Sequence, residues 1–212
     1  MLAGRYKDEP VDLKSVFEAV GAVEAGRMKA EELENLVEVA CPGCGSCAGM
    51  FTANSMNCLA EAIGMALPGN GTIPAVSAER LGLAKDAGVA VMSLLKNNIR
   101  PRDIMTKSAM TNALCVDMAI GCSSNTLLHL LALAREADLE IDLKSVDDLS
   151  SKVPNLCRIS PAGTYHMEDL HYAGGVSAIL RELSKADLVD LGVLTVTGNT
   201  LGENIKGAKI LN

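Results

Sequence analysis

The chain has 212 residues, enough to bury a hydrophobic core as one domain or as two small ones. Its 19 lysines and arginines against 26 aspartates and glutamates give a net charge of −7, which argues against nucleic-acid phosphates or an anionic membrane surface as partners and favours small-molecule ligands. No apolar run predicts a membrane span and no secretory signal opens the sequence, so we expect a cytoplasmic protein whose seven cysteines are free thiols or metal ligands.

Apolar residues at helical spacing predict several helices in the first hundred residues. Two amphipathic helices are separated near Gly26, and the second ends at a cysteine-rich loop. Good helix formers from Thr52 to Met65 predict another helix, which the turn residues of "LPGNGTIP" end. A longer helix between Ser77 and Asn97 ends before Pro101. The methionines expected to fill gaps in the core are Met28, Met50, Met56, Met65, Met92 and Met118.

Two further helices are predicted at 108–120 and 125–137, on either side of "GCSSN". The second is apolar on nearly all sides, so we expect it to be buried and the pair to lie in the core. The runs "NLCRIS" (155–160) and "VLTVT" (193–197) are typical of short β-strands, because Pro or Gly bounds them. The sequence between them is helical from Met167 to Leu183.

The end of the chain has one local signal of helix formation, since Thr200 and Glu203 fit a capping box. No linker or low-complexity tract divides the sequence. The sequence therefore predicts one helix-rich α/β unit over residues 1–212, with short strands in a small sheet.

The loop "CPGCGSCAGMFTAN" places Cys41, Cys44 and Cys47 at two-residue intervals. An iron–sulfur cluster needs thiolates that converge from a sharply turning backbone, and the glycines and the proline of this loop supply such turns. The spacing matches the first three positions of a bacterial ferredoxin motif, but the C-x3-C-P completion is absent. Spacing alone therefore leaves two interpretations open, a cofactor site and a set of buried thiols.

Two other uses of these cysteines fit the sequence less well. A zinc site would combine Cys41 and Cys44 with His166 and His171, but more than a hundred residues separate the two halves. A thioredoxin-like Cys-x-x-Cys pair should follow a strand, whereas the residues before Cys41 have a helical pattern.

The longer segment "ACPGCGSCAGMFTANSMNCLAEAIGMALPGNGTIPAVSAER" resembles the signature region of dihydroxy-acid dehydratases, the iron–sulfur enzymes of branched-chain amino-acid biosynthesis. Further similarity lies in "NALCVDMAIGCSSNTLLHL", "SPAGTYHMEDLHYAGG" and "LTVTGNTLGEN", so the resemblance covers nearly the whole chain. This combination is specific for the wider sugar-acid and dihydroxy-acid dehydratase family. It implies an internal portion of the family's N-terminal domain, and thus a truncated lyase without the C-terminal β-barrel domain.

Within this resemblance, the family's cluster cysteine in "GSCAGMFTAN" falls on Cys47, which is one ligand of three. Cys41 and Cys44 are not carried over as ligands, because the earlier cysteines of the loop vary among relatives. The family's other two cluster cysteines, its magnesium-binding carboxylates, its modified lysine and its serine base belong to segments that this sequence does not match. The resemblance therefore leaves the catalytic residues of this chain unknown.

The resemblance implies that the complete enzyme dehydrates a 2,3-dihydroxy acid to a 2-keto acid. Three thiolates leave one iron of the cluster free to act as a Lewis acid on the departing hydroxyl, while magnesium holds the substrate carboxylate and the neighbouring hydroxyl. With one thiolate of three, this chain alone is expected to hold no stable cluster and to be inactive. We also expect a homo-oligomer.

Other matched residues have a functional and a structural interpretation. Ser123, Ser124 and Asn125 precede a helix and would present hydroxyls and amides to a substrate carboxylate, or form an ordinary N-cap, which we favour. His166 would orient a ligand, but we favour a structural role at an acidic first turn of helix. The loop "PGNGT" lacks the lysine of a P-loop, so phosphate binding is not expected. The cysteines expected to be small buried hydrophobic residues are Cys58, Cys115, Cys122 and Cys157.

Two rival functions stay open at this point. A stand-alone protein would use Cys41, Cys44 and Cys47 for thiol redox chemistry or to hold a cluster for electron transfer, and titration of the thiols would separate that function from the dehydratase. A scaffold or assembly function would follow if apolar faces of the chain were exposed, because such faces bind other proteins.

Overall fold

A tight hairpin opens the part of the chain that the computed structural model describes, residues 2–211. Strand β1 (Gly4–Tyr6) pairs antiparallel with strand β2 (Glu9–Val11). Lys7 and Asp8 both have positive φ angles, 50° and 68°, as in the mirror-image turns whose twist matches that of two paired strands. This hairpin is the only sheet among the described residues.

The strands predicted at 155–160 and 193–197 are wrong. Each of these segments makes only an isolated bridge to a residue a few positions further along and pairs with no second strand among the described residues. Its other backbone hydrogen bonds reach distant loops and helices, at Met50 and Ala119 for the first segment and at Gly64 for the second. The expected helix-rich α/β fold with a small sheet is confirmed, but the sheet lies at the other end of the chain. The two bridges pair Ile159 with Tyr165 and Leu194 with Thr200.

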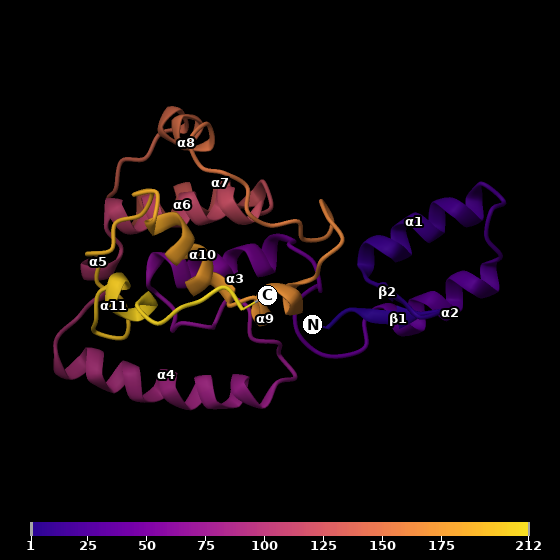
Figure 1. Ribbon diagram of the computed structural model, residues 1–212, viewed down its shortest axis with the longest axis horizontal. Coiled ribbons are helices and arrows are strands. Elements are labelled where there is room, and N and C mark those ends of the chain that lie inside the picture. The colour runs from indigo at the N-terminus through magenta and orange to yellow at the C-terminus, as the bar shows by residue number, and fades with distance from the viewer. Residues whose placement is uncertain (1, 212) are drawn as a thin grey trace.

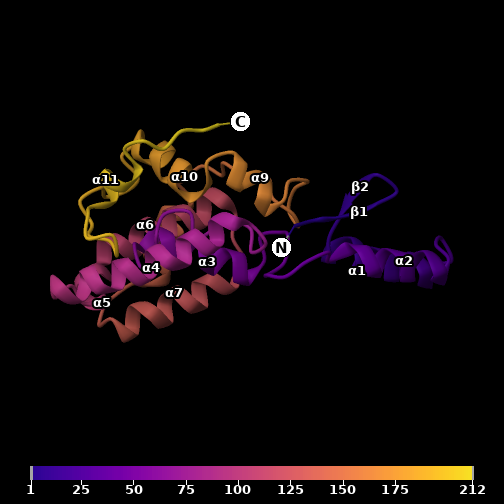
Figure 2. The same cartoon turned by 90° about the horizontal axis from the view of Figure 1, so that it is seen from below.

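The hairpin packs on helices α1 (Leu13–Glu24) and α2 (Ala30–Ala40), and together they form the N-terminal lobe, residues 4–40. Gly4 lies opposite Val11 in the sheet, and a Cβ at Gly4 would be 1.8 Å from the carbonyl oxygen of Val39, so the strand lies against α2 only because the residue is glycine. Figures 1 and 2 show the lobe projecting from one side of the molecule. Its separate hydrophobic cluster contains Val11, Ala19, Leu36 and Ala40.

Helix α6 (Lys107–Ile120) is the centre of the body, residues 52–211. Ten of its 14 residues are buried, and it packs against α3 (Thr52–Ile63) and α10 (Gly175–Ser184). The interpretation of residues 1–212 as one unit stays a prediction. The other helices of the body are α4 (Ala78–Lys96), α5 (Pro101–Ile104), α7 (Asn125–Glu136), α8 (Leu143–Ser150), α9 (Met167–Tyr172) and α11 (Leu201–Ile205).

The helices predicted from periodicity are confirmed, with two short additions, α5 and α8. One predicted helix is divided: the stretch from Met167 to Leu183 forms α9 and α10, because Gly174 and Gly175 have φ angles of 117° and 64°. The capping box of Thr200 with Glu203 is present at α11. Among the described residues, no helix combines the length and the apolar character that crossing a membrane would require.

Two expectations about burial are wrong. Helix α7 buries only Thr126, Leu130 and Ala134, and its Leu128 is 69% exposed. Met92, expected in the core, is 52% exposed on α4, a helix without any buried residue. Both helices lie at the surface of the body: α4 forms its lower edge in Figure 1, and α7 forms its lower edge in Figure 2.

Candidate functional site around Cys47

The cysteine loop, residues 41–51, connects the N-terminal lobe to the body. Its first two thiols, Cys41 and Cys44, are exposed, whereas Cys47 is half-buried, and all three are free. Cys47 therefore lies where the loop meets the body while part of the residue still reaches solvent.

Asn54, in the first turn of α3, holds the loop from one side. Its side-chain amide donates to the carbonyl oxygens of Cys47 and Gly49, at 2.5 and 2.7 Å, and its Oδ1 accepts the hydroxyl of Ser46 at 2.6 Å. The Asn54 side chain is buried, so water does not compete for these bonds. One side chain thus fixes the loop immediately before, at and after the cysteine.

A segment distant in sequence holds the loop from the other side. The backbone amide of Met50 donates to the carbonyl of Ser160 at 2.6 Å, and the amide of Met167 donates to the carbonyl of Ala48 at 2.8 Å. A Cβ at Gly49 would lie 2.5 Å from the Ser160 carbonyl oxygen, so the close approach requires glycine. The backbone that follows the cysteine is therefore bonded to residues more than a hundred positions away.

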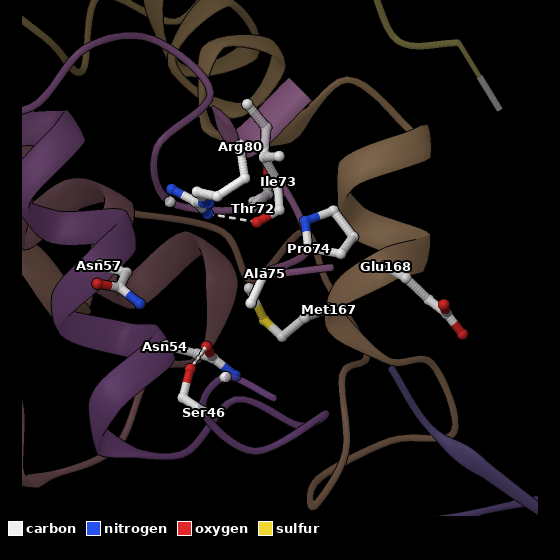
Figure 3. Close-up of a pocket in the computed structure, with 12 residues that line it drawn as sticks. Ser46, Asn54, Asn57, Thr72, Ile73, Pro74, Ala75, Arg80, Met167 and Glu168 are labelled. Atoms are coloured by element: carbon white, nitrogen blue, oxygen red, sulfur yellow. Dashed lines mark hydrogen bonds between the residues drawn. The ribbon is translucent and has the colours of Figure 1, made fainter. Parts of the chain in front are cut away.

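A pocket of about 260 Å³ adjoins the cysteine loop. Ser46 lines it next to Cys47 in sequence, Asn54 and Asn57 line it from α3, and Arg80 lines it from α4. Figure 3 shows Ser46 and Asn54 facing each other at one end of the pocket, with Arg80 at the other end. Hydroxyl, amide and guanidinium groups make this lining polar, and those of Ser46, Asn54 and Arg80 also hydrogen-bond to the protein itself.

Two charged side chains hold the loop that closes this pocket. Glu61 Oε2 accepts the backbone amide of Gly71 at 2.8 Å, and Arg80 donates to Oδ1 and to the carbonyl oxygen of Asn70 at 3.1 and 3.0 Å. Burial raises the pKa of the Glu61 carboxyl, and hydrogen bonds from the amides of Gly69 and Gly71 oppose that rise. The Gly71 amide, which a phosphate would need, is therefore already bonded to a carboxylate.

Ser123 and Asn125 converge on the start of α3. The Oγ1 atom of Thr52 lies 3.1 Å from Ser123 Oγ and accepts the Asn125 side-chain amide at 2.8 Å. Ser124 occupies the N-cap of α7 without a side-chain cap bond, and Ser123 Oγ instead accepts the Asn125 backbone amide at 3.4 Å. These side chains tie the first turn of α7 to the first turn of α3.

The two histidines near the site bond to different carboxylates. His166 is buried at the N-cap of α9, where its Nε2 lies 3.5 Å from Asp12 Oδ2 and its backbone amide donates to Asp169 at 2.7 Å. His171 Nε2 lies 3.2 Å from Glu79 Oε2. The structure therefore places His166 in a contact between the lobe and the body.

The cysteine loop alone does not form a metal centre. Within residues 2–211, no three His, Cys, Asp or Glu side chains gather closely enough to hold a metal ion, so the loop thiols do not converge and the two histidines do not complete a zinc site with them. The described residues fit one thiolate ligand of an iron–sulfur cluster, at the fixed and half-buried Cys47, but not a complete cluster.

The remaining cysteines are packing residues. Cys58 and Cys115 are completely buried, and Cys122 and Cys157 are half-buried. Burial raises the pKa of Cys115 and of Cys157 to about 11, and it raises the pKa of Cys58 and of Cys122 further above the ordinary value. These thiols stay protonated at neutral pH and are poor metal ligands or nucleophiles.

Sequence reasoning missed the residues that hold the cysteine in place. Asn54 has a recognisable signal, a polar residue in the first helical turn directly after a cysteine motif, where its side chain can reach back to the loop. Glu61, which holds the pocket loop at Gly71 and not the cysteine, gives a weaker signal as a charged residue among apolar helix residues. Ser160 gives none, because its role depends on contacts with residues far away in the sequence.

Comparison with known proteins shows that the chain is similar to one family of enzymes over nearly its whole length. A family model described as dihydroxy-acid/6-phosphogluconate dehydratase N-terminal matches residues 1–204. A dihydroxy-acid dehydratase of Carboxydothermus hydrogenoformans is 64% identical over 208 residues, which cover 98% of this chain and 38% of that protein. Dihydroxy-acid dehydratases of Halothermothrix orenii and Caldanaerobacter subterraneus subsp. tengcongensis are 60% and 59% identical, over 97% and 100% of this chain. The chain spans about 38% of the length of these relatives.

Proposed function

Because the chain belongs to the dihydroxy-acid/6-phosphogluconate dehydratase N-terminal family, we propose that it supplies one iron–sulfur ligand, Cys47, and part of the substrate pocket to a dihydroxy-acid dehydratase. The complete enzyme would convert a 2,3-dihydroxy acid to a 2-keto acid and water in branched-chain amino-acid biosynthesis. A bound cluster would supply a Lewis acid for the leaving hydroxyl, and magnesium would bind the substrate carboxylate.

The observation that carries this proposal is the fixed conformation of the loop on both sides of Cys47. A metal ligand must be positioned before the metal binds, because the ordering of a flexible loop would reduce the affinity. Asn54 and the backbone of Ser160 provide this order, and the adjoining pocket offers polar groups to a hydroxy acid. Cys41 and Cys44 lie on the exposed part of the loop as free thiols.

The substrate side of the proposal concerns groups that this chain itself provides. Ser46 and Asn57 present a hydroxyl and an amide to the pocket. The Arg80 guanidinium at the far end donates to Asn70, and its positive charge still favours an anionic ligand such as a carboxylate. A 2,3-dihydroxy acid carries one carboxylate and two neighbouring hydroxyls, which match this set of donors and acceptors.

The first test uses the chain alone, reconstituted anaerobically with iron and sulfide. We expect no cluster to survive gel filtration and no turnover of 2,3-dihydroxyisovalerate, because one thiolate cannot replace three. Turnover by the isolated chain would overturn the proposal that it holds only part of the site.

The second test restores the rest of the enzyme. The matched segment of the Carboxydothermus hydrogenoformans dehydratase is replaced by this chain, and the hybrid is expected to dehydrate 2,3-dihydroxyisovalerate. Cys47→Ser should abolish this activity, whereas the double variant Cys41→Ser/Cys44→Ser should retain it. Full activity of the Cys47→Ser hybrid would exclude Cys47 as an essential ligand.

We further propose a cytoplasmic setting and a homo-oligomeric enzyme. The seven free cysteines suit a reducing compartment. The exposed apolar side chains of α4, among them Leu81 and Leu95, suit a helix that is covered in an assembly. Sedimentation equilibrium of the hybrid enzyme tests the assembly, and a strictly monomeric, active hybrid would contradict it.

A further inference from the structure

The pentapeptide Asp-Leu-Lys-Ser-Val occurs twice in the chain, at 12–16 and 142–146, and begins a helix each time. Asp12 is the N-cap of α1, and Asp142 is the N-cap of α8. In both, Oδ1 accepts the backbone amide of the serine three residues later, at 3.1 and 2.7 Å. The same local sequence thus forms the same local cap, which needs only one carboxylate oxygen.

The surroundings of the two aspartates differ. Asp142 is exposed, whereas Asp12 is 4% exposed at the junction of the lobe and the body. The second oxygen of Asp12, Oδ2, accepts the hydroxyl of Ser160 at 2.5 Å and lies 3.5 Å from Nε2 of His166. Burial acts to raise the pKa of Asp12, but the hydrogen bonds from Ser160 and Ser15 and the neighbouring His166 outweigh it and lower the pKa. The carboxylate therefore stays charged at neutral pH and bonds strongly.

The residues that Asp12 contacts belong to the segment that holds the cysteine loop. The carbonyl of Ser160 accepts the Met50 amide, and the residue after His166 donates its amide to Ala48. Asp12 thus contacts a residue at or beside each of the two backbone hydrogen bonds: Ser160 for the bond to Met50, and His166 for the bond to Ala48. A shift of either partner would release the backbone that immediately follows Cys47.

We propose that Asp12 is a positioning residue for Cys47: its Oδ2 atom holds Ser160 and His166 against the cysteine loop, so that docking of the N-terminal lobe sets the exposure of the Cys47 thiol. The benefit of this role to an iron–sulfur cluster rests on the proposed function. The effect of Asp12 on the exposure of the Cys47 thiol does not, because it follows from contacts within the chain.

The test compares Asp12→Asn with Asp142→Asn in the 212-residue chain. Asparagine keeps an oxygen that can cap the helix, but the Asp12 variant loses the negative charge and an acceptor for Ser160. The rate of Cys47 alkylation by iodoacetamide is measured site by site by mass spectrometry, together with amide hydrogen exchange at Met50. Asp12→Asn should speed both several-fold, and Asp142→Asn should leave both unchanged.

Two controls separate positioning from a general loss of structure. The completely buried Cys58 should alkylate no faster in Asp12→Asn than in the unaltered chain, because global unfolding would expose it as well. Ser160→Ala removes the same hydrogen bond and leaves the α1 cap intact, so it should reproduce the effect, and the double variant should add little to either single one.

Three results would overturn the proposal: unchanged Cys47 alkylation and Met50 exchange in Asp12→Asn, equal effects of Asp12→Asn and Asp142→Asn, or additive effects of Asp12→Asn and Ser160→Ala. None of these measurements involves iron. A failure of cluster binding therefore leaves this test intact, and a failure of this test leaves Cys47 available as a ligand.

Discussion

The side-chain amide of Asn54 donates to the carbonyl oxygen of Cys47, which lies seven residues earlier in the chain. The first turn of α3, which follows the cysteine loop, thus holds the cysteine that precedes it. The same amide reaches Gly49, so the two bonds enclose the turn that directs the thiol.

Asn54→Ala should therefore destabilise the protein and release Cys47. The change removes the donor from the half-buried Cys47 carbonyl and from the buried Gly49 carbonyl, which costs about 1–3 kcal/mol of unfolding free energy. Urea unfolding measures this cost, and site-resolved alkylation should show faster reaction at Cys47. Asn57→Ala is the matched control, because Asn57 is an exposed residue of the same helix. Equal behaviour of the two variants would contradict the role of Asn54.

Five of the seven cysteines should separate into three reactivity classes. Cys41 and Cys44 are exposed and should react first with iodoacetamide, followed by the half-buried Cys47. Cys58 and Cys115 are completely buried and should react only when the chain unfolds. Mass spectrometry of timed samples measures the order. Early labelling of Cys58 or Cys115 in the folded chain would show that the core differs from the one described.

Asp117→Asn should make the protein more stable at neutral pH and less sensitive to pH. Burial raises the pKa of the Asp117 carboxyl, and hydrogen bonds involving Thr126 and Cys122 oppose that rise. Its Oδ1 atom is buried without a hydrogen-bond partner among residues 2–211. A carboxyl whose pKa is higher in the folded state stabilises the fold below its unfolded-state pKa, near 3.8, and loses that contribution as pH rises through the folded-state value.

The measurement is urea unfolding of both proteins at acid and neutral pH. The asparagine variant should gain about 1–2 kcal/mol at neutral pH, because a buried charge with an unbonded oxygen is removed. Its stability should also fall less steeply between acid and neutral pH than that of the unaltered chain. A loss of stability at neutral pH in Asp117→Asn would refute this interpretation.

Replacing Gly88 and Gly71 by alanine should change the stability of the protein in opposite directions. Gly88 lies in the middle of α4 with open space where a Cβ would be, so Gly88→Ala should stabilise the protein by about 0.5–1 kcal/mol. A Cβ at Gly71 would lie 2.8 Å from Cα of Cys58 and 2.9 Å from Val176, so Gly71→Ala should destabilise the protein and distort the pocket loop. Thermal unfolding of both variants checks the signs, and a stabilised Gly71→Ala would be inconsistent with the packing.

The helices were predictable because periodicity is a local signal, but the positions of the strands were not. The hairpin turn at Lys7 and Asp8 has positive φ angles without the Asn-Gly or Asp-Gly residues that announce such turns. The β-type residues of 155–160 and 193–197 instead lie in loops, whose backbones bond to Met50, Ala119 and Gly64 and not to a second strand. Strand pairing depends on a partner, which composition does not reveal.

The burial of a helix was predicted correctly for α6 but not for the outer faces of α4 and α7. Helix α6 is central as expected, but Leu128 of α7 and Met92 of α4 are exposed, because the apolar character of a helix does not say which segment covers it. At the site, the motif identified Cys47 as the candidate ligand. Its support by Asp12 and Ser160, which lie 148 residues apart, is a property of the folded chain alone.

The most direct measurement of the central claim is the iron and sulfide content of the hybrid dehydratase after anaerobic reconstitution, compared between Cys47→Ser and the double variant Cys41→Ser/Cys44→Ser. We predict that the Cys47 variant loses the cluster and its visible absorption, whereas the double variant retains both. A full cluster without Cys47, or its loss in the double variant alone, would contradict the assignment of Cys47 as the ligand that this chain contributes.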